Sequence, residues 1–243
     1  MSPVKASPTA RERARAELTR EITEEARRQL AETGAQGLSL RAVARELGMV
    51  SSALYRYFPS RDDLLTALII DAYDALGEIA ETAIAADARP RVRWLAACHA
   101  IRGWALAHPH EYSLIYGSPV PGYRAPQATV GPASRVPLAF MGVLRDGVAS
   151  DDMPAGDDDS AVAWPGLGGA LADQAAALAA ALVTVPGLPA VPSEVVVRAV
   201  IAWTQLFGMI SFELFGQFVG SFEPADALFD YAVAQLSAFV GLE

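Results

Sequence analysis

Apolar residues recur every three or four positions along most of this chain, and no run alternates with the two-residue period of a strand. The first helix is predicted at about 10–33. Its apolar face consists of Leu18, Ile22, Ala26 and Leu30. Thr9 and Glu12 have the spacing of a capping box at its start, and Gly34 follows its last residue. The pattern therefore favours an all-α fold.

A second long helix is predicted to begin near Arg61, because Ser60 and Asp63 repeat the capping-box spacing. Its apolar stripe consists of Leu65, Ile69, Ala72, Leu76 and Ile79. Further helices are predicted at about 90–107, 109–116, 134–149, 167–184, 193–219 and 224–240. Prolines in 117–133 and aspartates in 150–160 indicate loops. With two short helices between 39 and 58, we expect about nine to ten helices in total.

Two short helical patterns between Ser39 and Phe58 are hinged at Gly48. The first has one apolar face and Ser39 as its N-cap, and the glycine suits a turn that needs left-handed backbone angles. Their apolar positions are Leu40, Val43, Ala44 and Leu47, then Val50, Ala53, Leu54 and Phe58. Small Ala44 lets the two helices cross closely, so the second protrudes. This is the pattern of a helix-turn-helix, although a hairpin that only packs is the alternative.

A protruding helix can enter the major groove of DNA, where its side chains meet base edges. The expected base contacts are Ser51, Ser52 and Arg56. Short donors, helix N-termini and basic side chains suit phosphate oxygens instead. The expected phosphate contacts are Ser39, Arg41, Arg45, Tyr55, Tyr57 and Arg61.

Residues 10–66 resemble the DNA-binding domain of the TetR family of transcriptional regulators, above all in Leu-Tyr-Arg-Tyr-Phe-Pro-Ser-Arg-Asp-Asp-Leu-Leu from Leu54 to Leu65. The resemblance implies that Tyr55, Tyr57 and the basic residue opening the next helix hold the DNA backbone. That basic residue is usually lysine, and here it is Arg61. The rest of the chain resembles the family in layout only.

The charge of the chain is divided unevenly between two regions. Residues 1–61 hold eleven Lys and Arg against seven Glu, a net charge of +4, whereas the remainder has a net charge of −13. A basic region attracts phosphate, and an acidic body does not. We therefore expect a DNA-binding domain at 1–66, with a short disordered N-terminal arm, and a ligand-binding and dimerisation domain at 67–243.

Segments 167–184 and 195–219 are apolar almost all round, which raises the question of membrane spans. Polar residues interrupt both: Asp173, Gln174, Arg198, Gln205, Glu213 and Gln217. We therefore expect no membrane partner. Buried helices in a two-fold four-helix interface suit these segments, and the resemblance implies dimerisation through the penultimate helices. A homodimer would read a palindromic operator in double-stranded DNA, with half-sites about 34–36 Å apart.

Aromatic residues are frequent in the larger domain, and core packing accounts for most of them. The family resemblance nevertheless implies a small-molecule pocket. Trp94, Cys98, Ile101 and Trp104 share approximate helical spacing, and Tyr112 lies one turn from Tyr116. The expected pocket consists of Trp94, Cys98, Ile101, Trp104, Tyr112, Tyr116, Trp164 and Phe207.

Residues for catalysis are scarce. The three histidines His99, His108 and His110 lack the spacing of a metal site, and adjacent Cys98 and His99 face different directions on a helix. We expect no enzyme activity, no metal and no cofactor. One cysteine precludes an intramolecular disulfide, and the polar N-terminus lacks a signal peptide, so a cytoplasmic location is expected.

The sequence thus predicts a sequence-specific DNA-binding transcriptional regulator, a repressor by family habit, controlled by a small hydrophobic or aromatic effector. Two alternatives stay open. One is a DNA-binding architectural or division-control protein without an effector. The other is an all-α binding protein in which the hairpin is incidental.

Overall fold

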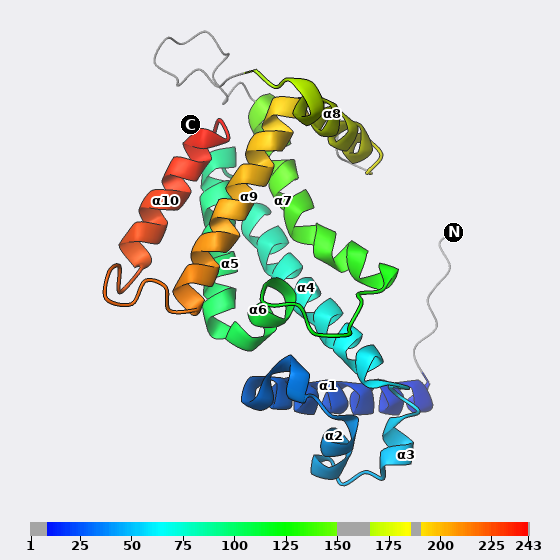
Figure 1. The fold of residues 1–243 in the computed structure, drawn as a ribbon. Helices are drawn as coiled ribbons and strands as arrows, with labels where there is room; N and C mark the ends of the chain where they lie inside the picture. Colours follow the sequence, from blue (N-terminus) through cyan, green and yellow to red (C-terminus); the bar gives the residue numbers. More distant parts are fainter. Residues whose placement is uncertain (1–8, 150–165, 186–190, 243) are drawn as a thin grey trace. The chain divides into compact units, whose positions relative to one another are not determined.

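The computed structural model describes residues 9–149, 166–185 and 191–242. Within these ranges the fold is all-α, with ten α-helices, one 3-10 turn and no strand (Figure 1). The helices are α1 (Ala10–Gly37), α2 (Leu40–Glu46), α3 (Ser51–Leu54), α4 (Arg61–Ile84), α5 (Pro90–Ala107), α6 (Pro109–Tyr116), α7 (Val130–Ala149), α8 (Gly169–Val183), α9 (Ser193–Leu214) and α10 (Asp226–Phe239). The helices predicted at 90–107 and 109–116 have the observed bounds, and the all-α prediction is confirmed.

The contacts divide the chain into two compact units. The first contains the chain up to Ala72 together with His110–Val130, and the second contains Tyr73–Pro109 and the chain from Gly131 onward. The predicted boundary at residue 66 divides the chain by function, into a DNA-binding part and a ligand-binding part, and it stays a prediction. By packing, however, α6 and the loop after it belong with the N-terminal unit.

The first unit has a core of aliphatic side chains from its first four helices. Completely or almost completely buried side chains are Ile22, Ala26, Leu30, Val43, Ala44, Leu54, Leu64, Leu65 and Leu68. Thr9 and Glu12 form the predicted capping box: the Glu12 amide donates to the Thr9 hydroxyl at 3.2 Å, and the Thr9 amide donates to the Glu12 carboxylate at 2.7 Å. Helix α1 extends to Gly37 rather than ending before Gly34, but it is kinked at Gly34, where φ is +69°.

The second unit is organised around α5, which packs against both α9 and α10, while α8 packs against α9 (Figure 1). Its buried face includes Trp94, Cys98 and Ile101. The described elements of this unit are all helices. Its core is therefore formed where side chains of one helix pack between those of the next.

Three arginines in the second unit bind carboxylates on other helices. Arg93 on α5 donates to Asp146 on α7 at 2.7 Å. Arg135 on α7 binds Glu81 on α4 with both ends of its fork, at 2.9 and 2.6 Å. The third, Arg102, is buried and joins α5 to the ends of α9 and α10, as described below.

Among the described helices, α9 alone has the length and apolar composition that would permit it to cross a membrane. Composition by itself does not distinguish such a helix from one in a protein core. Here Val195, Val196 and Leu206 of α9 are buried among the neighbouring helices, and Glu213 near its end is bound to Arg102. These contacts agree with the interpretation of α9 as a packed helix.

Candidate nucleic-acid interface and a cavity in the second unit

Helices α2 and α3 form the predicted helix-turn-helix. Ser39 caps α2, since its hydroxyl accepts the Ala42 amide at 3.4 Å. Gly48 has φ +64°, and the amide of Met49 donates to the carbonyl of Ala44 at 2.8 Å. An added Cβ at Gly48 would meet nothing within 4 Å, so the turn requires glycine for its backbone angles and not for space.

Regular α-helix in α3 is only one turn long, and a tighter turn follows it. The amide of Tyr57 donates to the carbonyl of Leu54 three residues back, at 2.8 Å. Leu54 and Phe58 are buried and anchor this segment to the core, as predicted. The prediction for Val50 was wrong: its side chain is 70% exposed. Val50 occupies the N-cap position, where the backbone is extended and helical periodicity does not yet apply.

The residues predicted to contact bases lie on the outer side of this segment. Ser51, Ser52 and Arg56 are exposed, and within the described part of the chain no hydrogen bond engages their side chains. Tyr55 is also exposed. The structure therefore leaves their donors available to another molecule, while their contacts with DNA stay a prediction.

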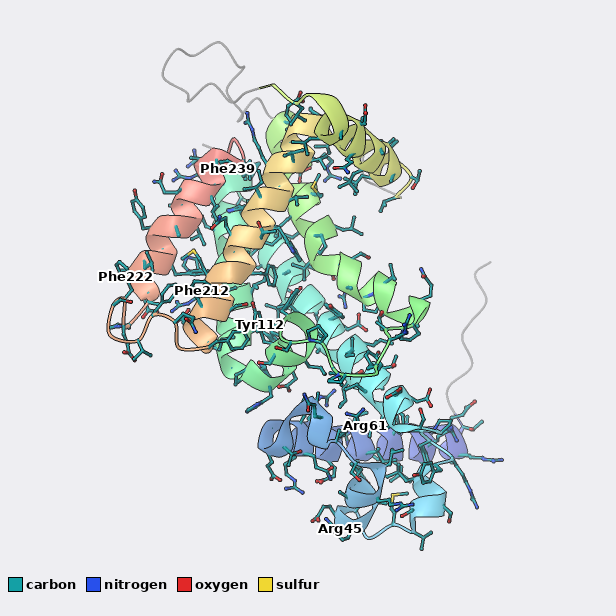
Figure 2. All side chains as sticks on the ribbon, viewed as in Figure 1. Arg45, Arg61, Tyr112, Phe212, Phe222 and Phe239 are labelled. Atoms are coloured by element: carbon teal, nitrogen blue, oxygen red, sulfur yellow. The ribbon has the colours of Figure 1, made fainter. Side chains whose placement is uncertain are left out.

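The predicted phosphate contacts on α2 have similar freedom. Arg41 is exposed, and Arg45, labelled in Figure 2, extends from α2 with its Nε 3.4 Å from the carboxylate of Glu46.

Tyr57, another predicted phosphate contact, is half-buried, and its ring lies under the guanidinium of Arg15, with 4.9 Å between the guanidinium carbon and the ring centroid. Arg15 was not singled out from the sequence. No local signal in the sequence indicated it, because pairing over 42 residues is a tertiary contact.

Arg61, the remaining predicted phosphate contact, makes hydrogen bonds within the chain. Its Nε donates to the carbonyl of Leu38 at 3.1 Å, and one Nη donates to the carbonyl of Ala35 at 2.6 Å. Those carbonyls lack helical partners because the kink at Gly34 and the linker to α2 interrupt the helix. The guanidinium thus joins the start of α4 to the α1–α2 linker, and its contact with phosphate stays a prediction.

The second unit contains an apolar cavity of about 370 Å³ between α5, α7, α8 and α9. It is lined by Trp94, Pro137, Phe140, Met141, Leu178, Leu182, Val196, Ala199, Val200, Ala202, Trp203 and Leu206. Among the predicted pocket residues that the structure describes, Trp94 alone belongs to this lining. Its ring packs against Phe140, with 4.6 Å between the ring centroids.

The other predicted pocket residues do not line this cavity. Cys98 and Ile101 are completely buried on α5, and burial raises the pKa of the Cys98 thiol. Trp104 stacks on His108, and Phe207 packs beside Trp203. Trp94, Cys98 and Ile101 lie on one buried face of α5, and of these three only Trp94, near the start of the helix, borders the cavity. Helical spacing therefore identified the face but not how far along it the cavity extends.

The remaining three predicted pocket residues are not part of the second unit as described. Tyr112 and Tyr116 belong to the first unit, where their rings lie 5.2 Å apart and Tyr112 is completely buried. Trp164 and the aspartate-rich segment 150–160 lie outside the described residues.

Comparison with known proteins places both parts of the chain among bacterial regulators. Residues 22–68 match the family described as bacterial regulatory proteins, tetR family, and residues 94–236 match the tetracyclin repressor-like C-terminal domain. HTH-type transcriptional regulators of Mycobacterium tuberculosis and Mycobacterium bovis are 41% identical over 210 residues, which cover 84% of this chain and 84% of each relative.

Solved structures show the same fold over nearly the whole length. One, of a protein assigned a regulatory role, is 35% identical, covers 95% of this chain and 100% of its own, and has a TM-score of 0.71. A TetR family transcriptional regulator from Thermus thermophilus, PfmR, is 19% identical, with 87% of this chain and 96% of its own covered and a TM-score of 0.55. The second likeness concerns the fold alone.

Proposed function

Because the chain belongs to the TetR family of bacterial transcriptional regulators, we propose that it is a dimeric repressor that binds a palindromic operator and responds to a small apolar effector. The observation that carries the proposal is the outer side of α3 and of the turn after it, where Ser51, Ser52 and Arg56 are exposed and their donors are unused within the described residues. Arg56 is the residue we assign to base recognition, because a guanidinium can bind a guanine edge with two hydrogen bonds.

The phosphate contacts are assigned to donors around this reading segment. They are the Ser39 region at the start of α2, Arg41, Arg45, Tyr55 and Tyr57. Arg15 covers the ring of Tyr57 and adds positive charge beside it. Arg61 supports binding indirectly, by holding the α1–α2 linker. Such contacts fix orientation on the duplex and make affinity depend on salt.

Dimerisation is assigned to the outer faces of α9 and α10, whereas the sequence pointed to 167–184 and 195–219. On α9 the surface positions Ile201, Gln205, Gly208, Phe212 and Phe215 follow the alternating four-and-three spacing of a heptad seam. On α10 the positions Ala227, Tyr231, Ala234 and Ala238 repeat this spacing. The two helices pack against each other, and Phe212 is labelled near the end of α9 (Figure 2). Two copies could therefore form a four-helix bundle.

A dimer explains how a reading segment this short gives specificity. Two reading segments about one DNA turn apart bind a palindrome with much greater avidity than one does. As a bacterial regulator that binds DNA, the protein would act in the cytoplasm. Effector binding to the second unit would favour one arrangement of the dimer and so change operator affinity.

The test is quantitative binding to DNA from the region upstream of the protein's own gene, mapped first by footprinting. Arg56→Ala should relax base preference at one position of each half-site, at a cost of about 1–3 kcal/mol on the best sequence. Arg41→Ala should weaken all sequences alike and lower the salt slope by about 1. Arg89→Ala, an exposed arginine at the start of α5, is the control for loss of charge and should change neither quantity.

The alternatives make different predictions in the same experiment. Broad binding at many loci without a discrete palindrome would favour the architectural protein. Absence of salt-dependent binding would contradict any DNA-binding function. Equal effects of Arg56→Ala and Arg41→Ala on every sequence would contradict the assignment of base and phosphate contacts.

A further inference from the structure

Val50 is exposed at the start of the reading segment, immediately before the first residue of α3. Its side chain is 70% exposed, and between residues 9 and 72, all of which the structure describes, Val50 and Tyr55 are the two large hydrophobic side chains on the surface. Tyr55 carries a hydroxyl group that can bond to water, whereas valine has no polar atom in its side chain. Over this range, therefore, the one exposed large side chain without a polar atom lies where we assign base recognition.

Valine is also an unfavourable residue for the position that it occupies. Helices α1, α2 and α4 each begin after a hydroxyl side chain that accepts a backbone amide of the first turn, from Thr9, Ser39 and Ser60 respectively. Val50 is the N-cap residue of α3 and provides no such bond. Serine or threonine would stabilise the start of the helix, and valine is among the least favourable N-cap residues. The side chain of Val50 thus contributes neither a cap nor a buried surface to the fold.

The position of Val50 determines which chemical group it meets on DNA. Side chains at the N-terminal end of the second helix of a helix-turn-helix contact base edges in the major groove. Most groups presented there are hydrogen-bond donors and acceptors, and the 5-methyl group of thymine is the apolar exception. Ser51, Ser52 and Arg56 suit the polar groups, because each carries hydrogen-bond donors. Valine can bond to none of these groups, but packing on the methyl group removes apolar surface from water.

We propose that Val50 contacts the 5-methyl group of one thymine in each operator half-site and makes thymine the preferred base at that position. This inference rests on the proposed function, in which α3 and the turn after it read the operator. It adds a specificity-determining residue to the three base contacts assigned there. The base that Val50 selects is recognised by its methyl group, whereas the polar side chains beside it recognise bases by hydrogen bonds.

The experiment replaces thymine by uracil, one position at a time, in the operator that footprinting defines. Uracil lacks the 5-methyl group and keeps the hydrogen-bonding groups of thymine, so the substitution removes only the proposed contact. Binding of the full-length protein is measured by fluorescence anisotropy. At one thymine of the half-site, the substitution should weaken binding about fourfold, and about 15-fold when both half-sites are changed, which corresponds to one buried methyl group per half-site.

Two variants locate the effect. Val50→Ser removes the methyl groups of the side chain and supplies a capping hydroxyl, so it should bind the thymine and uracil operators equally, with a melting temperature no lower than that of the parent. Parent and variant with the two operators form a double-mutant cycle, which isolates the contact. Val92→Ser is the matched control, because Val92 is a 48% exposed valine on α5 in the second unit, and it should retain the response of the parent.

Four results with a parent that binds the operator would overturn the assignment of Val50. They are the absence of any thymine whose methyl group matters, a response to uracil that persists in Val50→Ser, loss of all operator binding by the folded variant, and a lower melting temperature, which would show that valine serves the fold. A parent that binds no discrete operator would contradict the proposed function and this inference with it. The two failures are distinguishable, because the first leaves operator binding by the parent intact.

Discussion

Arg102 binds α5 to both helices of the proposed dimer interface, and we predict that its loss destabilises the second unit. Its Nε and one Nη donate to the two carboxylate oxygens of Glu213 at 2.7 and 2.6 Å, and its other Nη donates to Asp226 at 3.0 Å. The guanidinium also lies 4.9 Å from the ring of Phe229. The hydrogen bonds to Glu213 raise the pKa of Arg102, so it is charged at every accessible pH.

The expected magnitude follows from the burial of each partner. The side chains of Arg102 and Glu213 are only 10% and 17% exposed, whereas that of Asp226 is 67% exposed and contributes little. Removing one partner of a fully buried ion pair costs about 3–5 kcal/mol. Because water partly reaches Glu213, we expect Arg102→Met to lower the free energy of unfolding by about 2–3 kcal/mol.

Urea unfolding followed by circular dichroism at fixed protein concentration measures this effect. Arg89→Met, on the exposed start of the same helix, is the control and should be neutral. The double variant Arg102→Met with Glu213→Gln should be more stable than Arg102→Met alone, because no uncompensated charge remains buried. A loss below about 0.5 kcal/mol for Arg102→Met, or a double variant no more stable than it, would refute the reasoning.

Three further predictions concern the turn, the α1–α2 linker and acid stability. Gly48→Ala should lower the free energy of unfolding of the first unit by about 1–2 kcal/mol in thermal denaturation, because only the positive φ opposes it; a neutral substitution would contradict this. Arg61→Lys should cost about 0.5–1.5 kcal/mol of stability, since one ammonium group cannot replace the fork on two carbonyls, while the salt slope of operator binding stays unchanged; a reduced slope would restore Arg61 as a phosphate contact. Hydrogen bonds from Arg135 hold the pKa of Glu81 below its ordinary value, so the stabilisation is complete at neutral pH and is lost as the pH falls from the ordinary value through the lowered one. Because this pair is half-exposed, Glu81→Gln should cost less than about 1 kcal/mol at pH 7 and flatten the decline in stability as the pH falls below that ordinary value; an unchanged acid profile would contradict the assignment.

Local patterns predicted the helix-turn-helix well because its determinants lie within a few residues of one another. Ser39 caps α2, Gly48 has the positive φ that the turn needs, and Leu54 and Phe58 are buried as expected. Val50 was misassigned because one helical turn has too few positions for its periodicity to define a face.

Residues of the predicted sites were less predictable wherever their partners are distant in the sequence. Arg61 was expected to contact phosphate, which stays a prediction, and no local pattern indicated that its guanidinium binds carbonyls 23 and 26 residues away. On α5, the spacing that grouped Trp94 with Cys98 and Ile101 is equally compatible with core packing and with a cavity wall. The lining of the cavity combines four helices, and their mutual packing is not encoded in the period of any one of them.

The sequence by itself determined the helical class, most helix positions, the reading turn and the family, because capping, glycine conformation and hydrophobic period act over one or two turns. Only the tertiary structure decided that the Arg61 guanidinium binds carbonyls of the α1–α2 linker, that α9 packs on α10, and that Trp94 alone of the described pocket candidates borders the cavity. The physical reason is that the helical period identifies an apolar face but not what packs on it. Which side becomes core, interface or cavity depends on the neighbouring helices that pack against it.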